Sequence, residues 1–381
     1  IWIMSKIELI ATATFGLEAL VAEELKALGY DNLKVENGRV TFEADEMAIC
    51  RSNLWLRTAD RVRLKVGEFE ATTFDELFEK TKALPWADIL PADAAFPVDG
   101  KSVQSKLFSI SDCQAIVKKA IVESLKKHYK KEWFGEKGAL FKTEVSMLKD
   151  RATLTIDTSG AGLHKRGYRT AGSEAPLREN LAAALLLIAR WQPEISLIDP
   201  FCGSGTFPIE AAMIGRKMAP GMNRNFAAEE WPLVAKELWQ TARREMHEVA
   251  DYEKELDISG YDIKDSAIRQ ARKNAQEAGV DDALHFQARP FGELSSKRKY
   301  GKIVCNPPYG ERLGEQREIE KLYREFGRMM KNLDTWSFYI LTAHEHFEKF
   351  ASKKASKKRK LYNCNLKVHY YQYFGPRPPR R

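Results

Sequence analysis

The sequence lacks a run of about 20 apolar residues, the length that crosses a bilayer. Its most apolar stretch, LAAALLLIARW (181–191), is too short and follows the charged LREN. The first residues also lack the basic, apolar and small-residue order of a secretory signal. These absences predict a cytoplasmic protein with no membrane partner.

Cysteine is scarce. The chain has five cysteines that lie far apart, and none belongs to a CxxC pair. We therefore expect neither a disulfide framework nor a zinc site. His344 and His346 form an HxH pair, but no cysteine or carboxylate at ligand spacing completes it, so we predict no metal site.

Acidic residues are absent from the C-terminal segment. Residues 351–381 contain ten Lys or Arg and no Asp or Glu, so the other 350 residues sum to −2 of the net +8. A second basic run, VKKAIVESLKKHYKK, covers residues 117–131. Either run alone is typical of a solvated face. Two runs in a chain of pI about 9.0 favour a polyanionic partner, foremost nucleic acid.

The N-terminal pattern predicts strands and helices in the order β-α-β-β-α-β. Strands are expected at 6–14 and 61–70 and in a hairpin around Asn37-Gly38, with helices at 16–30 and 45–56. Asn-Gly is the strongest short hairpin signal, and this element order is the ferredoxin-like arrangement. We therefore predict a ferredoxin-like domain over residues 5–70.

The rest of the chain predicts two further parts. Residues 71–160 favour a second α/β module, with helices at 72–84 and 111–131 and two strands around Lys149-Asp150. Residues 161–176 are rich in glycine and small residues, which is typical of a linker. From 177 to 381, strands alternate with long helices. This predicts a Rossmann-like parallel sheet, covered on both faces, with its ligand at the carboxyl ends of the strands.

The first strand end of that sheet reads DPFCGSGTFPIEAA. Asp199 ends the strand, and Gly203-Ser204-Gly205-Thr206 turns into a helix whose free N–H groups suit an anion. Pro208 breaks the GxGxxG pattern of dinucleotide sites, and GK[ST] of the P-loop is missing. Asp199 could hold an ammonium group and the loop a carboxylate, as S-adenosylmethionine would need. A lone glycine loop also has structural uses.

Two further strand ends strengthen this interpretation. Asp262 ends the next strand, where an acid binds ribose hydroxyls, although it could also cap the helix that follows. Asn306-Pro307-Pro308-Tyr309 ends the fourth strand. The Asn306 side chain and the Pro307 carbonyl could accept both hydrogens of an exocyclic amine and turn its lone pair toward a methyl donor. Tyr309 could stack on a flipped base. A structural turn is the alternative for a proline pair alone.

Taken together, these segments resemble the class I S-adenosylmethionine-dependent methyltransferases that modify exocyclic amines. More narrowly, VQSKLFSISDCQAIVKKAIVESL, GLHKRGYR and APLRENLAAALL resemble the THUMP-domain RNA methyltransferases related to the bacterial 23S rRNA guanine-N2 methyltransferases. The resemblance covers essentially the whole chain. It implies that 71–160 is a THUMP module for RNA and that 177–381 is the methyltransferase domain.

The resemblance also implies the site residues. The implied amine-binding residues are Asn306, Pro307, Pro308 and Tyr309; the implied cofactor-binding residues are Asp199, Phe201, Cys202, Gly203, Ser204, Gly205, Thr206, Asp262, Ile263, Gln287 and Ala288. Many relatives carry an acid after the third strand for the adenine amine, whereas this chain has Ala288-Arg289. Gln287, a backbone carbonyl or packing against Phe291 would then hold the adenine.

The expected function is methyl transfer from S-adenosylmethionine to an exocyclic amine of an RNA base, foremost guanine N2 in 23S rRNA. The alternatives are guanine N2 or adenine N6 in tRNA or another RNA, or a ribosome-assembly factor that binds RNA without catalysis. RNA is the expected partner, and the chain could be a monomer or a homodimer.

Overall fold

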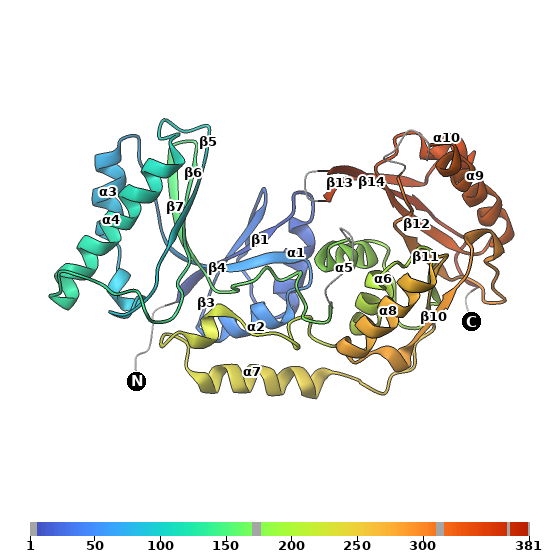
Figure 1. The fold of residues 1–381 in the computed structure, drawn as a ribbon, viewed down its shortest axis with the longest axis horizontal. Helices are drawn as coiled ribbons and strands as arrows, with labels where there is room; N and C mark the ends of the chain where they lie inside the picture. Colours follow the sequence, from blue (N-terminus) through green and yellow to red (C-terminus); the bar gives the residue numbers. More distant parts are fainter. Residues whose placement is uncertain (1–5, 170–176, 310–315, 364–365, 380–381) are drawn as a thin grey trace. The chain divides into compact units, whose positions relative to one another are not determined.

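The computed structural model describes residues 6–169, 177–309, 316–363 and 366–379 (Figure 1). The chain divides into two compact units. The first comprises Ile1–Thr14, Glu18–Leu163 and Arg224–Glu245, and the second comprises Phe15–Leu17, His164–Asn223 and Met246–Arg381. No helix among the described residues is both long enough and apolar enough to span a bilayer.

The described strands of the first unit form one sheet in the order β2-β3-β1-β4-β7-β6-β5. Strand β4 is shared between its two halves: Ala59–Lys65 pairs with β1, and Arg63–Glu70 pairs with β7. The predicted ferredoxin-like and second modules are therefore continuous through one long strand. The bounds are β1 Ile7–Ala13, β2 Lys34–Glu36, β3 Arg39–Ala44, β4 Ala59–Glu70, β5 Val98–Val103, β6 Thr143–Leu148 and β7 Arg151–Asp157.

Four helices pack on this sheet: α1 Glu18–Ala27, α2 Met47–Trp55, α3 Phe74–Lys82 and α4 Ile110–Tyr129. Helix α4 buries Val117, Ile121 and Leu125, whose spacing of four residues keeps them on one face. It begins after Ser109, whose hydroxyl accepts a hydrogen bond from the Asp112 amide. The residue after its last turn, Lys130, adopts the left-handed conformation.

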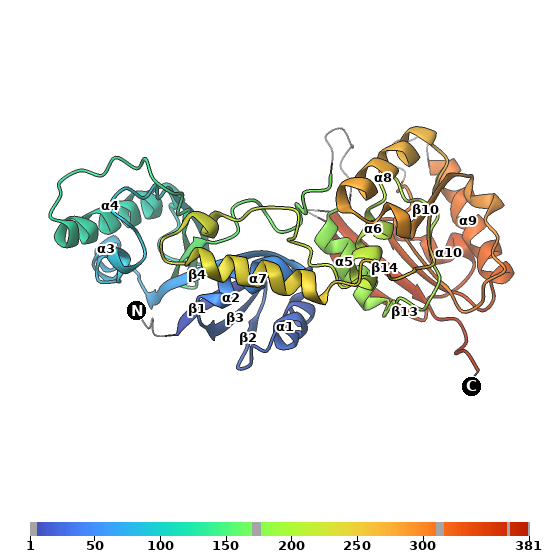
Figure 2. The same cartoon turned by 90° about the horizontal axis from the view of Figure 1, so that it is seen from below.

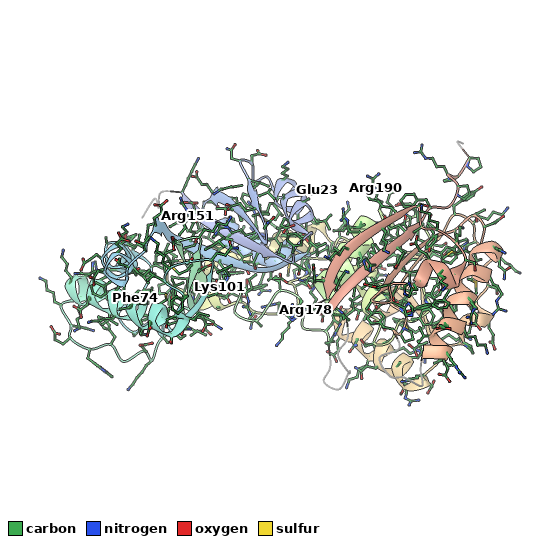
Figure 3. The ribbon with its side chains drawn as sticks, turned by 90° about the horizontal axis from the view of Figure 1, so that it is seen from above. Glu23, Phe74, Lys101, Arg151, Arg178 and Arg190 are labelled. Atoms are coloured by element: carbon green, nitrogen blue, oxygen red, sulfur yellow. The ribbon has the colours of Figure 1, made fainter. Side chains whose placement is uncertain are left out.

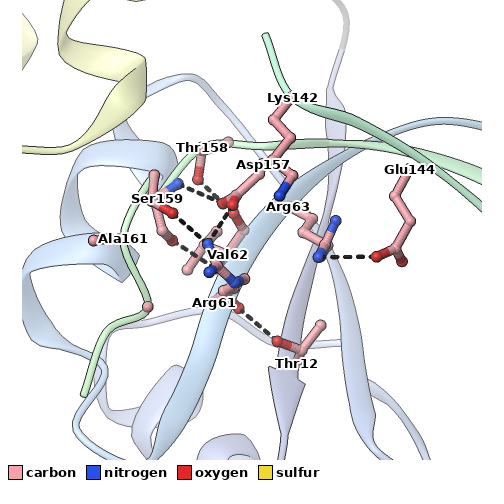
Figure 4. A network of polar contacts seen from close by, with 12 residues as sticks. Thr12, Arg61, Val62, Arg63, Lys142, Glu144, Asp157, Thr158, Ser159 and Ala161 are labelled. Atoms are coloured by element: carbon pink, nitrogen blue, oxygen red, sulfur yellow. Dashed lines mark hydrogen bonds and ion pairs between the residues drawn. The ribbon is translucent and has the colours of Figure 1, made fainter. Parts of the chain in front are cut away.

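Polar contacts tie β4 to β7 and to the segment that follows it (Figure 4). Arg61 forms an ion pair with the buried Asp157. The Val62 amide donates to the Ser159 hydroxyl at 2.9 Å, and the Val62 carbonyl accepts from the Thr158 amide at 3.0 Å. These contacts satisfy the backbone where β4 passes from one neighbouring strand to the other.

Cations on this sheet are also ion-paired. Figure 3 shows Lys101 of β5 and Arg151 of β7 among the side chains. Lys101 lies 3.0 Å from a carboxylate oxygen of Glu144, and Arg151 lies 3.2 Å from one of Glu68.

Residues 224–245 pack with the first unit, although the sequence placed them in the C-terminal part. Trp231 stacks on Phe141 with ring centroids 4.5 Å apart, and its indole N–H donates to the Leu140 carbonyl. Arg51 makes two hydrogen bonds to Glu245. Because the aromatic and charged partners are distant in sequence, helical periodicity alone did not indicate this packing. The predicted division at 70, 160 and 176 stays a prediction.

The second unit contains the sheet β10-β9-β8-β11-β12-β14-β13 in the described chain. The first five strands are parallel, while β14 runs antiparallel to both β12 and β13. This confirms the predicted Rossmann-like sheet. The bounds are β8 Leu197–Asp199, β9 Ile258–Asp262, β10 Leu284–Ala288, β11 Lys302–Cys305, β12 Ser337–Thr342, β13 Lys357–Asn363 and β14 Leu366–Tyr373.

Helices cover both faces of this second sheet (Figures 1 and 2). Neighbouring residues of β14 show the two faces: Tyr370 donates to the Leu185 carbonyl of α5, whereas Tyr371 belongs to the core with α9 and α10. Arg178 and Arg190 flank α5 (Figure 3). The bounds are α5 Glu179–Ile188, α6 Thr206–Gly215, α8 Asp265–Ala278, α9 Gln316–Asn332 and α10 Phe347–Ala351. Helix α7, Lys236–Val249, lies mostly within residues 224–245 and so belongs largely to the first unit.

Residues 164–169 of the predicted linker belong to the second unit, whereas 161–163 belong to the first. Arg166 and Tyr168 are each only 1% exposed, and both contact Glu210 of α6. The glycine-rich composition suggested a linker, because composition alone does not show that two large side chains, Arg166 and Tyr168, anchor this segment. Residues 170–176 lie outside the described residues.

Candidate active site

Three functional candidates meet at the carboxyl edge of the second sheet. Asp199 ends β8, Asp262 ends β9, and Asn306 directly follows β11. Strand β8 lies between β9 and β11, and neighbouring strands are about 4.8 Å apart. The chain leaves β8 toward β9 on one side, while β11 lies on the other. This is the topological switch point at which open α/β sheets bind ligands.

The loop from Asp199 to α6 depends on its glycines. Gly203 and Gly205 have φ values of +51° and +86°, a region that favours glycine. A Cβ on Gly205 would lie only 3.0 Å from the Ala271 Cβ and 3.1 Å from the Phe286 ring. Asn274 of α8 donates to the Ser204 carbonyl at 2.9 Å. Close packing against Ala271 and Phe286 and the hydrogen bond from Asn274 thus fix the conformation of the loop.

Two carboxylates border this loop in different ways. Asp199 is 1% exposed and accepts a hydrogen bond from the Phe201 amide at 3.0 Å. Burial, opposed by that hydrogen bond and reinforced by the charge of Asp262, raises the pKa of Asp199 well above its ordinary value. Asp262 accepts from the Gly203 amide at 3.1 Å and from the Lys264 amide at 2.9 Å. A cation next to Asp199 would therefore be strongly favoured.

These groups line one cavity of about 1030 Å³. The candidates that line it come from all three strand ends: Asp199, Phe201, Cys202, Gly203, Ser204, Thr206, Asp262, Ile263, Asn306 and Pro308. Gly205 lies behind the loop, against Ala271 and Phe286. Pro307 and Tyr309 belong to the same turn as Asn306 but are not among the lining residues.

Gln287 and Ala288 do not line the cavity. Both are exposed at the end of β10, paired with Tyr261 and Asp262 of β9. The wall beyond β10 is instead formed by Pro290, Phe291 and Gly292. Of these residues, the sequence had indicated only Phe291.

Sequence reasoning missed the walls that are supplied by helices and by the residues just before them. These residues are Leu177, Phe207, Lys264, Ser266, Ala267, Gln270, Leu322 and Glu325. Ser266 and Gln270 lie one helical turn apart at the start of α8, directly after Asp262, so helical spacing next to a strand end was an available signal. Leu322 and Glu325 lie on α9, where no sequence feature pointed to the cavity.

The Asn306 turn is fixed by tyrosine hydroxyls. The Tyr309 hydroxyl donates to the Asn306 side-chain oxygen. Tyr323, a buried residue of α9, donates to the Pro308 carbonyl at 3.1 Å and lies 2.9 Å from the Thr342 hydroxyl. The Asn306 oxygen has a second lone pair for a ligand. This turn therefore offers a positioned acceptor at the edge of the cavity.

Comparison with protein families assigns the chain. Its residues 8–63 match the RlmL ferredoxin-like domain, 71–157 match the THUMP domain, and 166–372 match the RMKL-like methyltransferase domain. The chain belongs to the RMKL-like methyltransferase family. It is an S-adenosylmethionine-dependent methyltransferase, in agreement with the prediction.

Relatives align over nearly the whole of this family member. The chain is 52% identical over 380 residues to the "Putative RNA methyltransferase YpsC" of Bacillus subtilis, covering 99% of this chain and 98% of that protein. It is 34% identical over 400 residues to the ribosomal RNA large subunit methyltransferase K/L of Syntrophotalea carbinolica. The match covers 98% of this chain but 55% of that relative, so the chain spans about half of the K/L protein.

Solved structures share the fold. A "predicted N6-adenine-specific DNA methylase" from Listeria monocytogenes is 55% identical with a TM-score of 0.94, covering 98% of this chain and 97% of that one. SMU.472, described as a putative methyltransferase complexed with SAH, is 47% identical, also with a TM-score of 0.94, covering 99% of this chain and 100% of that one.

The cavity fits the family's cofactor. S-adenosylmethionine carries an ammonium, a carboxylate, two ribose hydroxyls and an apolar adenine face. The cavity offers the buried carboxyl of Asp199, the N-terminus of α6, the acid Asp262 and the exposed apolar side chain of Ile263. Each group of the cofactor thus has a chemical complement on one continuous wall.

Proposed function

We propose that this methyltransferase modifies an exocyclic amine of an RNA base, foremost guanine N2 in 23S rRNA. The observation that carries the proposal is Asn306 in the turn after β11, which lines the same cavity as Asp199 and Asp262. This brings an amine acceptor to the cofactor cavity. The proposal implies a cytoplasmic protein with an RNA partner.

Within the proposal, the cofactor residues have distinct tasks. Asp199 holds the ammonium group, the amides of Ser204 and Thr206 hold the carboxylate, and Asp262 accepts from the ribose hydroxyls. The Gly203 and Gly205 amides already donate to Asp262 and to the Cys202 carbonyl. Ile263 and Phe291 pack against the adenine. The packing of Phe291 supports its role. Its ring lies on those of Phe201 and Phe326, with centroids 5.0 Å and 4.5 Å away, which fixes its position in the cavity wall. Gln287 and Ala288 lie at the exposed end of β10 and do not line the cavity, so the adenine contact is assigned to Ile263 and Phe291 instead.

Replacing Asp199 with asparagine tests the ammonium site. The affinity for S-adenosylmethionine should fall about 10- to 100-fold, because a hydrogen bond between charged groups contributes about 1.5–3 kcal/mol. Calorimetric titration measures it. Wild-type affinity should also decline as pH falls through the raised pKa of Asp199, since only the ionised carboxyl attracts an ammonium.

The asparagine variant should lack this pH dependence. Asp281→Asn, the same change at an exposed acid outside the cavity, should bind like the wild type. Equal affinity of the Asp199→Asn variant and the wild type for S-adenosylmethionine would show that Asp199 does not bind the ammonium group.

In the proposed mechanism the target amine is activated by hydrogen-bond acceptors and not by a strong base. The lone pair of an exocyclic amine is delocalised into the ring, so the amine must be turned before it can attack a methyl group. Asn306 and the Pro307 carbonyl accept its two hydrogens, which orients the nitrogen and stabilises its developing positive charge. The hydrogen bond from Tyr309 fixes the orientation of the Asn306 amide, and Tyr323 fixes the next carbonyl.

RNA is the proposed substrate because of the N-terminal modules and the relatives. A THUMP domain precedes the methyltransferase domain. Relatives carry the names RNA methyltransferase and ribosomal RNA methyltransferase. The Listeria structure, whose name specifies adenine N6 in DNA, makes that base the second candidate.

Methyl transfer to several acceptors in parallel tests the proposal. Purified protein and labelled S-adenosylmethionine are incubated with unmodified 23S rRNA, tRNA, DNA and a release factor, whose glutamine side-chain amide also presents an NH₂ group on an sp² carbon. Label incorporation is measured for each acceptor, and the nucleic acids are analysed by nucleoside mass spectrometry. The expected product is N2-methylguanosine in rRNA. Detection of N6-methyladenosine would change the proposed target base from guanine to adenine but leave the proposed chemistry unchanged. Label on DNA or on protein alone would refute RNA as the substrate, and label on none of the four would refute the proposal.

A further inference from the structure

The β13–β14 hairpin carries cations on one face. In this hairpin Lys358 lies opposite Tyr371, Lys360 opposite His369, and Lys367 opposite Tyr362. Directly opposed residues of an antiparallel pair point to the same side, and alternate residues along a strand share a face. Lys358, Lys360 and Lys367 therefore project from one face, and all three are exposed. We call these three lysines the hairpin cluster.

The three charges of the hairpin cluster all act on one residue, His369. His369 lies among them, and its pKa is lowered by burial and by Lys358, Lys367 and Lys360, against the opposing charge of Glu345. Glu345 lies 3.6 Å from Lys367, in a pair whose side chains are about half exposed or more. This carboxylate offsets one of the three lysine charges. The face therefore retains a net positive field.

The hairpin cluster lies at the same edge of the sheet as the Asn306 turn. Cys305, the residue before Asn306, pairs with Ile340, and Ile340 pairs with Tyr371. One step further toward the carboxyl edge, Thr342 pairs with His369, which pairs with Lys360. Three strand spacings separate β11 from β13, roughly 14 Å. A nucleic-acid strand spans this distance within a few nucleotides.

Packed side chains connect the turn and the hairpin cluster. Tyr323, which donates to the Pro308 carbonyl, contacts the His344 ring with centroids 5.3 Å apart. The adjacent Glu345 offers its carbonyl to the Tyr371 hydroxyl at 3.4 Å and its carboxylate to Lys367. The candidate amine site and the lysines are thus connected by residues in contact with one another, of which Tyr323 and Tyr371 lie beneath the surface.

We propose that the hairpin cluster binds the phosphate backbone of RNA beside the target nucleotide and so directs that nucleotide toward Asn306. This inference rests on the proposed function. Complementary charge supports the occupant, because residues 351–381 carry ten Lys or Arg and no acid, and phosphates release counterions when lysines bind them.

Protection of the sheet edge is the competing explanation. Lysines on an edge strand prevent pairing with a second molecule, and β13 is an edge strand. Edge protection does not account for Lys367, however, because β14 lies inside the sheet between β12 and β13. It also does not require the lysines of two strands to share one face.

The test compares two double variants of the full-length protein. Lys358→Gln/Lys360→Gln removes two charges of the hairpin cluster. Lys297→Gln/Lys299→Gln removes two exposed charges from the loop before β11, at the amino edge of the same sheet. Affinity for in vitro transcribed 23S rRNA is measured between about 50 and 200 mM salt, together with methyl transfer and S-adenosylmethionine affinity.

We expect the hairpin variant to have a shallower salt dependence. The slope of log affinity against log salt should fall by about 1.4 to 1.8, the contribution of two phosphate contacts. Its KM for RNA should rise, while kcat at saturating RNA and cofactor affinity stay unchanged. The loop variant should keep the wild-type slope.

Three results would overturn the inference. Equal slopes for the wild type and the hairpin variant would exclude phosphate binding at this face. New self-association of the hairpin variant with an unchanged slope would assign the lysines to edge protection. Failure of the wild type to bind or methylate any RNA would refute the proposed function and the inference together, whereas methylation with equal slopes refutes only the inference.

Discussion

Replacing Asn306 with alanine is expected to lower kcat about 10²- to 10³-fold, the loss seen when a preorganised polar group is removed from a transition state. The side-chain oxygen of Asn306 is the acceptor that the proposed mechanism uses to orient the amine. Because that contact strengthens as charge develops on nitrogen, kcat and kcat/KM should fall together. Single-turnover methyl transfer at saturating RNA measures the effect, and calorimetry should give wild-type affinity for S-adenosylmethionine.

Two further variants separate the acceptor from the shape of the turn. Asn306→Asp keeps an acceptor oxygen and adds a negative charge near the developing positive charge, so it should retain more activity than alanine. Tyr309→Phe keeps the ring and removes only the hydroxyl that donates to Asn306, so its loss should be smaller than that of alanine. Full methylation by the alanine variant would show that Asn306 is not the acceptor.

Local patterns predicted most of the fold. The order of β1, α1, β2, β3, α2 and β4 follows from alternation, helical spacing and the Asn37-Gly38 hairpin, where Gly38 has a φ of +76°. Strand β5 was missed because Val98–Val103 contains aspartate, glycine, lysine and serine and alternates only between partial and full exposure. Its pairing with β6 is parallel and spans more than 40 residues, which no local pattern encodes.

The candidate site was predictable where it depends on strand ends. Carboxyl ends of adjacent parallel strands share one edge, so Asp199, Asp262 and Asn306 could be grouped from sequence order. The contributions of α9 could not, because Leu322 and Glu325 line the cavity only when α9 is packed against strands that are distant in sequence. The basic half of β13 was also missed, since Lys357–Lys360 has the composition of a solvated tail and becomes a strand only by pairing with β14.

Replacing Arg166 with methionine is expected to destabilise the second unit by about 3–5 kcal/mol, the cost of leaving one buried charge without its partner. Arg166 and Glu210 have side chains that are 1% and 0% exposed, joined by hydrogen bonds of 3.3 and 3.1 Å. Burial alone would lower the pKa of Arg166, but the charge of Glu210 more than offsets it, so the arginine is charged. Hydrogen exchange of peptides from α6, followed at increasing urea concentrations, measures the loss of unfolding free energy.

The matched control is the Arg51–Glu245 pair of the first unit. It also has two hydrogen bonds, of 2.9 and 2.6 Å, but its side chains are 37% and 33% exposed. Arg51→Met should therefore cost no more than about 1 kcal/mol in that unit. A similar cost at both positions would show that burial does not govern the Arg166 effect.

The double variant Arg166→Met/Glu210→Leu separates the pair from its surroundings. It should recover most of the stability, because an apolar pair of similar volume has no charge to desolvate. Recovery should be incomplete, since the Tyr168 hydroxyl, which donates to Glu210 at 3.1 Å, would lose its acceptor. Helix α6 begins at Thr206, directly after the cofactor loop. S-adenosylmethionine affinity should therefore fall in the single variant and recover in the double one, which would tie the buried pair to the position of that loop.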